Sequence, residues 1–288
     1  MKFQAPKGFT VVLPKDLDEA CRIQASEKTR CKLVAGGTDV LAQWAAGVPM
    51  PARVLSLWNL EGLVGIEVGK DGLVEIGAAT THAAIYGHPG LKARLPALVA
   101  ACSSVGATQI QQRGTLGGNA ANASPAGDTG PALLVTDGCV LFASAKGLRT
   151  VPIAEFWTGY RQIAARPDEI VATFLLPSKG GAREGFRKIG TRRAQAISKI
   201  MAAYRIAVRK NVVERAALAL GSVAAVPVRL PDVERFLLGQ TVTPGLADAA
   251  AKLAFDSVQP ISDIRSSADY RRHAAASLVR SIVASLAQ

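Results

Sequence analysis

Apolar and polar residues alternate in short blocks along the first 180 residues. Strand-like apolar runs bounded by glycine, proline or charged turns are predicted at 9–13, 32–35, 53–58, 64–68, 73–78, 139–143 and 170–176, and a strand followed by a turn at 150–156. Helical spacing of apolar positions is predicted at about 17–29, 40–46, 82–86 and 91–105. Asp16 and the pair Thr80-Thr81 stand where helix N-caps are expected. This mixture predicts an α+β protein.

The pattern changes after the glycine-containing linker SKGGA at 178–182, where we predict a domain boundary between 178 and 179. Three strands are predicted at 183–190, 200–208 and 214–223, followed by helices at about 230–239, 244–257 and 269–287. The last helix carries an apolar stripe at four-residue steps, formed by Ala274, Leu278, Ile282 and Leu286. Residues 179–288 are therefore predicted to form a three-stranded antiparallel sheet backed by helices.

One long polar stretch interrupts the apolar pattern, at residues 106–134. It contains six glycines, two prolines and two charged residues, Arg113 and Asp128. Loops longer than ~12–15 residues are usually functional or disordered, and the low charge here argues against disorder. We expect a loop whose exposed backbone forms a ligand-binding surface.

A second glycine segment follows the strand predicted at 32–35. Gly36 and Gly37 lie between this strand and the helix predicted at 40–46, so bare backbone N–H groups converge where an anion such as phosphate can bind. A tight turn is the commoner use of Gly-Gly after a strand. The spacing is not G-x-G-x-x-G, so a Rossmann domain has no direct support. The hydroxyls of Thr80 and Thr81 could cap a helix or bond a pyrophosphate.

Composition narrows the class of protein. The chain has 288 residues, of which 49% are hydrophobic and 19% charged, enough for a large core in one to three domains. No apolar run approaches the ~18–20 residues of a membrane span, and the first twenty residues lack a signal-peptide core, so we expect a cytoplasmic protein. Four separated cysteines and three histidines predict free thiols and no metal or iron–sulfur cluster in this chain.

The net charge of +12 is concentrated in the C-terminal part. Residues 1–179 contribute +3 and residues 180–288 contribute +9, because the latter hold 17 basic and 8 acidic residues. Such a part could face nucleic acid, an acidic cofactor or an acidic partner. Scattered charges and only 5% aromatic residues disfavour nucleic acid.

Together, three segments resemble those of a known family. AGGTDV (Ala35–Val40) precedes TLGGNAANASPAGD (Thr115–Asp128) by about eighty residues, and FRKIGTRR (Phe186–Arg193) follows. This order resembles the FAD-binding, medium subunit of the molybdenum hydroxylases, which include the xanthine dehydrogenase and carbon monoxide dehydrogenase relatives. The resemblance covers essentially the whole chain. It implies a two-lobed FAD-binding domain of the vanillyl-alcohol oxidase class, with lobes at about 1–56 and 57–178, and a C-terminal domain at 179–288.

The resemblance also implies cofactor-binding residues, and none that is catalytic or ligates a metal. The first loop would wrap the pyrophosphate with Leu33, Val34, Ala35, Gly36, Gly37, Thr38, Asp39 and Val40. The second would lie at the pyrophosphate and ribityl chain with Thr115, Leu116, Gly117, Gly118 and Asn119. Asp128 would bond the adenosine, Val105 and Val171 would flank the cofactor, and Lys188 would contact it from the C-terminal domain. Further hydrogen-bond partners would be Thr80, Asn122 and Ser124. Neither loop contains histidine, so we expect non-covalent FAD.

By the same resemblance, the chain passes electrons from a partner subunit to an external acceptor. A large subunit would carry molybdopterin and a small one two 2Fe-2S clusters, in two copies of each chain. NAD, oxygen and quinone stay open as acceptors, since the acidic residue that many relatives have after Arg192-Arg193 is replaced by Ala194-Gln195-Ala196. The alternatives are a stand-alone FAD-dependent reductase, akin to the enzyme that reduces UDP-N-acetylenolpyruvylglucosamine, and a non-enzymatic nucleotide-binding module.

Overall fold

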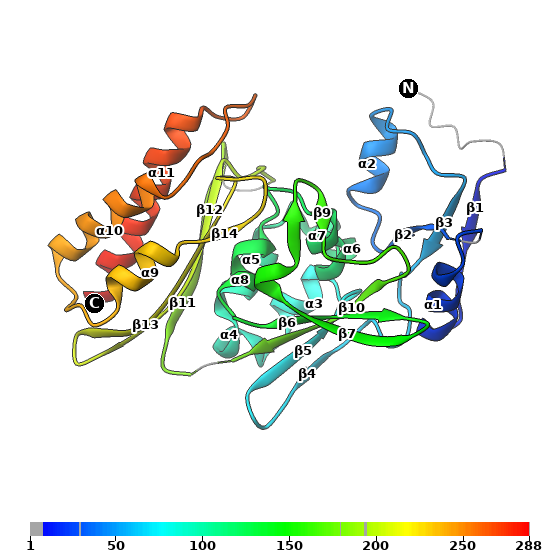
Figure 1. Cartoon of the computed structure of the whole chain (residues 1–288), viewed down its shortest axis with the longest axis horizontal. Helices are drawn as coiled ribbons and strands as arrows, with labels where there is room; N and C mark the ends of the chain where they lie inside the picture. The colour runs from blue at the N-terminus through cyan, green and yellow to red at the C-terminus, as the bar shows by residue number, and fades with distance from the viewer. Residues whose placement is uncertain (1–7, 29, 179, 193–194, 288) are drawn as a thin grey trace.

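The computed structural model describes residues 8–28, 30–178, 180–192 and 195–287. Figure 1 shows three parts in a row: a small sheet with α1 and α2 at one end, a larger central sheet with α3 to α8, and a third sheet with α9 to α11 at the other end. Helices and sheets are mixed throughout, which confirms the α+β prediction. No helix among the described residues is long and apolar enough to span a membrane.

The small sheet contains β1 (Thr10–Val12), β3 (Arg53–Ser56) and β2 (Lys32–Val34), which are parallel in that order. Helix α1 (Leu17–Ala25) begins as predicted, because the Asp16 carboxylate accepts a hydrogen bond of 2.7 Å from Glu19 N. Helix α2 (Val40–Ala45) follows β2 but buries none of its residues. This sheet therefore supports α2 only weakly.

The central sheet has five antiparallel strands in the order β4-β5-β10-β6-β7. These are β4 (Ile66–Val68), β5 (Leu73–Gly77), β6 (Cys139–Ser144), β7 (Gly147–Pro152) and β10 (Ile170–Pro177). In β10, Phe174 pairs with Ile76 on one side and Val140 on the other, and all three are fully buried. The helices α3 (His82–Gly87), α4 (Leu91–Arg94) and α5 (Pro96–Ser104) share this core. The short turn η1 (Ile153–Glu155) and the hairpin of β8 (Trp157–Gly159) and β9 (Gln162–Ile163) lie beyond β7.

Two predictions for this part were wrong in detail. The predicted helix at 91–105 is broken at Leu95, because the proline that follows starts a new helix at its first position. The stretch 106–134 is not one loop, since it forms α6 (Thr108–Arg113), α7 (Leu116–Asn122) and α8 (Thr129–Leu134). These helices have six or seven residues each, too short for an apolar period of 3.6 to show.

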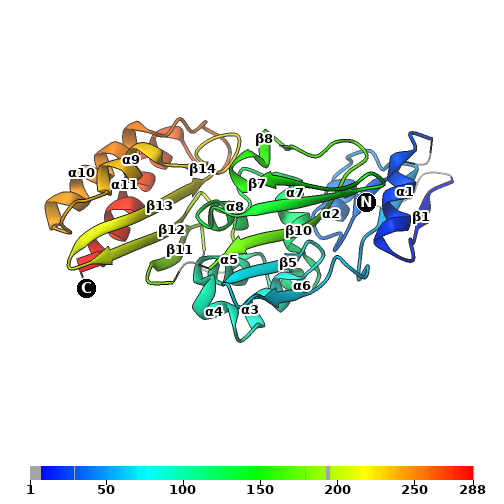
Figure 2. The ribbon, with the colours of Figure 1, turned by 60° about the horizontal axis from the view of Figure 1, so that its bottom comes forward.

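The third sheet is antiparallel, in the order β11 (Arg183–Ile189), β12 (Ile200–Arg209), β13 (Val212–Gly221), β14 (Val228–Arg229). The fourth strand was not predicted, because it has only two residues. Helices α9 (Pro231–Leu237), α10 (Pro244–Asp256) and α11 (Ala268–Ala284), with the turn η2 (Ser285–Ala287), cover one face of this sheet (Figure 2). The apolar stripe predicted on the last helix is buried as expected: Ala274, Leu278, Ile282 and Leu286.

The other face of the third sheet packs against the helices α5 and α8 of the central part. There Arg205 is 5% exposed and its Nε lies 2.5 Å from Glu184 Oε2. It also donates to Pro177 O at 2.8 Å, while Glu184 accepts from Ala97 N at 3.2 Å. The central and C-terminal parts are thus joined by buried polar contacts. The boundary between 178 and 179 stays a prediction, and Lys179 lies outside the described residues.

Candidate cofactor-binding site

The first glycine segment forms the turn between β2 and α2. Gly37 has φ +75°, a left-handed conformation that glycine adopts without strain, and its carbonyl accepts from Leu41 N at 3.0 Å. The backbone N–H groups of residues 36–39 have no hydrogen-bond acceptor among the described residues. Four unpaired N–H donors on one partly exposed turn can bind an anion.

The second glycine segment uses its N–H groups differently. Leu116 N donates to Thr80 O at 3.0 Å and Gly117 N to Ala78 O at 2.8 Å. Gly118 N is capped by Thr115 Oγ1 at 3.0 Å. Asn119 N donates to Thr115 O at 2.9 Å, so the N–H groups of residues 116–119 are all bonded within the protein. The segment instead offers a fixed surface in which Gly118 is exposed and carries no side chain.

Close backbone packing brings the two glycine segments together. A Cβ placed on Gly36 would lie 1.7 Å from the carbonyl oxygen of Arg113, which directly precedes the second segment. Within the central part, a Cβ placed on Gly117 would lie 2.6 Å from the Cβ of Ala78. Only glycine fits either position. The side chain of Gln43 in α2 contacts Asp39 and lies 3.5 Å from Asn122 Oδ1 in α7. The contact between Gly36 and Arg113 could not be inferred from the sequence, because the two residues are far apart along the chain and meet only in the fold.

Several predicted hydrogen-bond partners already have partners within the protein. Thr80 is 2% exposed, and its hydroxyl both donates to Gly65 O and accepts from Gly65 N at 3.0 Å. Asn119 Oδ1 accepts from Thr129 Oγ1 at 2.5 Å, and Ser124 Oγ accepts from Ala126 N at 3.3 Å. The Thr80 hydroxyl is thus buried and bonded to the backbone of Gly65.

Asp128 and Lys188 contact each other. Lys188 Nζ lies 2.6 Å from Asp128 Oδ2 and donates to Ser104 O at 3.0 Å, while Ser198 Oγ donates to Asp128 Oδ1 at 2.6 Å. Burial raises the pKa of Asp128, and Lys188 opposes this rise. The structure therefore gives this pair a role that was not predicted, as a buried ion pair between α8 and β11. Val105, half-buried, ends α5 beside it.

The remaining predicted residues lie around these segments. Leu33 and Val34 form the end of β2, Thr38 and Val40 lead into α2, and Val171 is buried in β10. Arg192 Nη2 donates to Gln195 O at 2.7 Å, whereas Arg193 and Ala194 lie outside the described residues. His82 is 1% exposed beneath the second segment, where its backbone N donates to Gly114 O at 2.9 Å. Among the described residues no cluster of histidine, cysteine or carboxylates could hold a metal ion.

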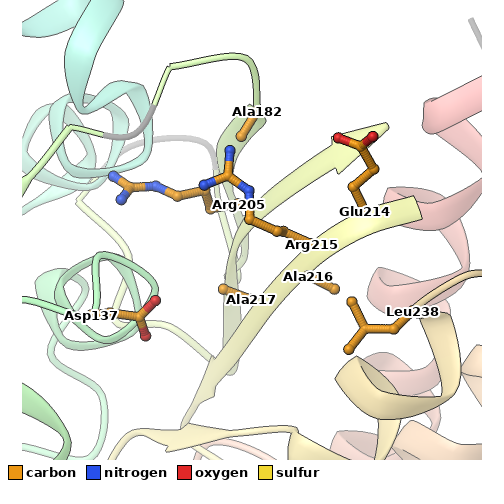
Figure 3. A pocket seen from close by; sticks show the side chains of 8 residues that line it. All are labelled: Asp137, Ala182, Arg205, Glu214, Arg215, Ala216, Ala217 and Leu238. Atoms are coloured by element: carbon orange, nitrogen blue, oxygen red, sulfur yellow. The ribbon is translucent and has the colours of Figure 1, made fainter. Parts of the chain in front are cut away.

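A separate cavity of about 300 Å³ lies in the C-terminal part (Figure 3). Arg205, Asp137 and Leu238 line it together with residues of β13, and none of them belongs to a glycine segment. Asp137 is paired with Arg229 at 2.6 Å, and Arg205 with Glu184. Asp137 and Arg205 are thus already paired, and we assign the cavity no part in the cofactor site.

Comparison with known proteins identifies the cofactor that this site fits. Residues 6–179 match the family model described as FAD binding domain in molybdopterin dehydrogenase, and residues 185–286 match CO dehydrogenase flavoprotein C-terminal domain. FAD carries a diphosphate, which suits the four unpaired N–H groups of the first turn. The residues present therefore fit FAD.

Similar proteins extend over nearly the whole chain. The nicotine 6-hydroxylase medium subunit of Paenarthrobacter nicotinovorans is 30% identical over 93% of both chains. The xanthine dehydrogenase FAD-binding subunit of Escherichia coli O157:H7 is 30% identical over 90% of this chain and 89% of its own. A solved carbon monoxide dehydrogenase from Hydrogenophaga pseudoflava superposes with a TM-score of 0.93 at 26% identity, covering 99% of both chains. The predicted resemblance is confirmed: the chain belongs to the family of FAD-binding, medium subunits of the molybdenum hydroxylases, and is an oxidoreductase component.

Proposed function

We propose that this chain is the electron-exit subunit of a molybdenum hydroxylase. It would take electrons from the 2Fe-2S clusters of a small partner subunit and pass them through FAD to an external acceptor. A large molybdopterin subunit would hydroxylate the substrate, and two copies of each chain would form the complex in the cytoplasm. The names of the relatives support this proposal, because they are medium or FAD subunits of dehydrogenases.

One observation of the site carries the proposal: the four unpaired N–H groups of residues 36–39. When bound, FAD supplies the redox chemistry, so the protein has to bind, orient and shield it. Hydrogen bonds to a charged group contribute about 1.5–3 kcal/mol each, so this turn can hold a diphosphate without a lysine or arginine in the segment itself. The backbone of 115–119 would form the opposing surface, and the Asp128–Lys188 pair would fix the C-terminal domain beside it.

Domain organisation follows the same proposal, with the FAD-binding domain at 1–178 and the C-terminal domain at 179–288. The basic C-terminal part would face an acidic partner or an anionic acceptor such as NAD. Recombining the purified subunits at low and high salt tests this part of the proposal, because exposed charges are screened by salt. Assembly and acceptor kinetics that both ignore salt would contradict it.

The experiment that tests the function uses the chain alone and in its complex. The purified chain should bind FAD reversibly and show a flavin band near ~450 nm. In the complex, addition of the substrate that the large subunit hydroxylates should reduce FAD and bleach that band, and one of NAD, oxygen or a quinone should restore it. A chain that reduces a small substrate with a nicotinamide donor and needs no partner would instead be the stand-alone reductase. A chain that never takes up FAD would refute both the electron-exit subunit and the stand-alone reductase.

A further inference from the structure

Arg113, whose role the sequence left open, stacks on a tryptophan of the first part of the chain. Its guanidinium carbon lies 3.8 Å from the centre of the Trp58 ring, within the range of a cation–π contact. Arg113 is exposed, and it forms no ion pair with any residue that the structure describes. The contact with Trp58 is therefore its main side-chain interaction.

Both ends of this contact are fixed to the backbone around the first glycine turn. On one side, Leu57 N donates to Val34 O at 2.8 Å and Trp58 N to Ser56 Oγ at 3.3 Å, which holds the tryptophan at the end of β2. On the other side, Gly114 N donates to Ile110 O at 2.6 Å, which holds Arg113 at the end of α6. The stack therefore joins the small sheet to the central part.

Gly36 lies against the backbone of the same arginine. Its missing Cβ would be 1.7 Å from Arg113 O and 2.5 Å from Arg113 C. Any movement of Arg113 relative to the small sheet therefore changes the contact on which the turn rests. The helix that follows the turn offers little support, since α2 buries none of its residues.

We propose that Arg113 and Trp58 form a latch that positions the turn at 36–39 for the diphosphate of the cofactor. This inference rests on the proposed function, because it assumes that the turn holds FAD. Arg113 is a positioning residue in this proposal: it acts by holding the turn against the end of α6, and its charge need not reach the phosphates. Trp58 is its partner on the small sheet.

The test measures FAD binding by the deflavinated full-length chain, through titration and dissociation rate. Because loss of the cation–π contact also displaces the turn, Arg113→Ala and Trp58→Leu should each weaken FAD binding about three- to tenfold. The double variant should be no weaker than either single variant, because both remove the same contact. Trp58→Phe should restore most of the affinity, since it keeps an aromatic face.

Arg94→Ala is the matched control. Arg94 is the exposed last residue of α4, as Arg113 is of α6, and it lies over no aromatic ring of the residues that the structure describes. Its removal should leave FAD binding unchanged. Thermal unfolding of each deflavinated variant shows whether the fold is retained.

Three outcomes would overturn the latch. Wild-type affinity in both Arg113→Ala and Trp58→Leu would show that the stack does not position the turn. Full rescue by Arg113→Lys, with no effect of Trp58→Leu, would show that the arginine acts by charge alone. A wild-type chain that binds no FAD would refute the proposed function and the latch together, whereas the first two outcomes refute the latch only.

Discussion

Replacing Gly36 with alanine would place a methyl group where the carbonyl oxygen of Arg113 already lies. The new Cβ would be 1.7 Å from that oxygen and 3.1 Å from Gly114 N. A carbon and an oxygen that are not bonded need well over 3 Å, so the two backbones must separate by roughly 1.5 Å. Arg113 is held by α6, whereas the turn precedes a helix with no buried residue, so we expect the turn to move.

The cost to FAD binding follows from the donors on this turn. A displacement of about 1.5 Å takes a hydrogen bond of ordinary length beyond 3.5 Å, where it no longer counts as one. Loss of two such bonds to a charged diphosphate costs about 3–6 kcal/mol, which corresponds to roughly 10²–10⁴-fold weaker binding. The fold itself should persist, because the three hydrophobic cores do not include Gly36.

Fluorescence titration of deflavinated protein with FAD measures this change, and urea unfolding of the same samples reports the fold. Gly87→Ala is the control, since a Cβ on Gly87 would meet nothing within 4 Å and Gly87 ends α3 away from the turn. It should bind FAD as the wild type does. If Gly36→Ala unfolds cooperatively and still binds FAD within about threefold of the wild type, the turn is not the diphosphate site.

Three further predictions concern stability, measured as the free energy of unfolding in urea. Burial lowers the pKa of His82 to about 4, so between pH 6.5 and 4 only the unfolded chain takes up a proton at this residue. The wild type should therefore lose about 3 kcal/mol of stability on acidification over this range, whereas His82→Leu should not. Parallel pH profiles of the two proteins would contradict this. Asp128→Asn leaves the Lys188 ammonium buried without its counter-ion and should cost about 3–5 kcal/mol of stability. The double variant Asp128→Asn, Lys188→Met should recover most of this loss. An equal loss in the double variant would argue against the ion pair. Lys210 has φ +49° in the turn between β12 and β13, a conformation that glycine adopts without strain. Lys210→Gly should therefore stabilise the protein by about 1 kcal/mol. A lower urea midpoint of unfolding in this variant would exclude backbone strain at Lys210.

Sequence patterns predicted the elements that are long or clearly capped. The start of α1 followed from Asp16, and the strand β10 from the largely apolar run at 170–176 before Pro177. The stretch 106–134 was predicted as a loop because its three helices are shorter than two full turns and are separated by residues such as Gly114. Local patterns carry too little information at that length.

For the site, the sequence predicted the backbone better than the side chains. The Gly36-Gly37 turn could be inferred because glycine between a strand and a helix constrains the local backbone directly. The partners of Thr80 and Asp128 could not be inferred, since they lie 15 and 60 residues away and meet only in the folded chain. The same holds for Arg113, whose contact with Trp58 joins the end of α6 to the segment that follows β3.

The weak support of α2 has a consequence for how the protein becomes mature. One side of the cofactor site is rigid, because α7 is bonded to the central sheet and the central part is joined to the C-terminal sheet by buried ion pairs. The other side is a short turn and a helix without buried residues. A ligand that binds only the ordered form stabilises it by mass action. FAD is therefore expected to stabilise the turn at 36–39 and the helix α2 as it binds, so that cofactor loading would be a late step in the folding of this subunit.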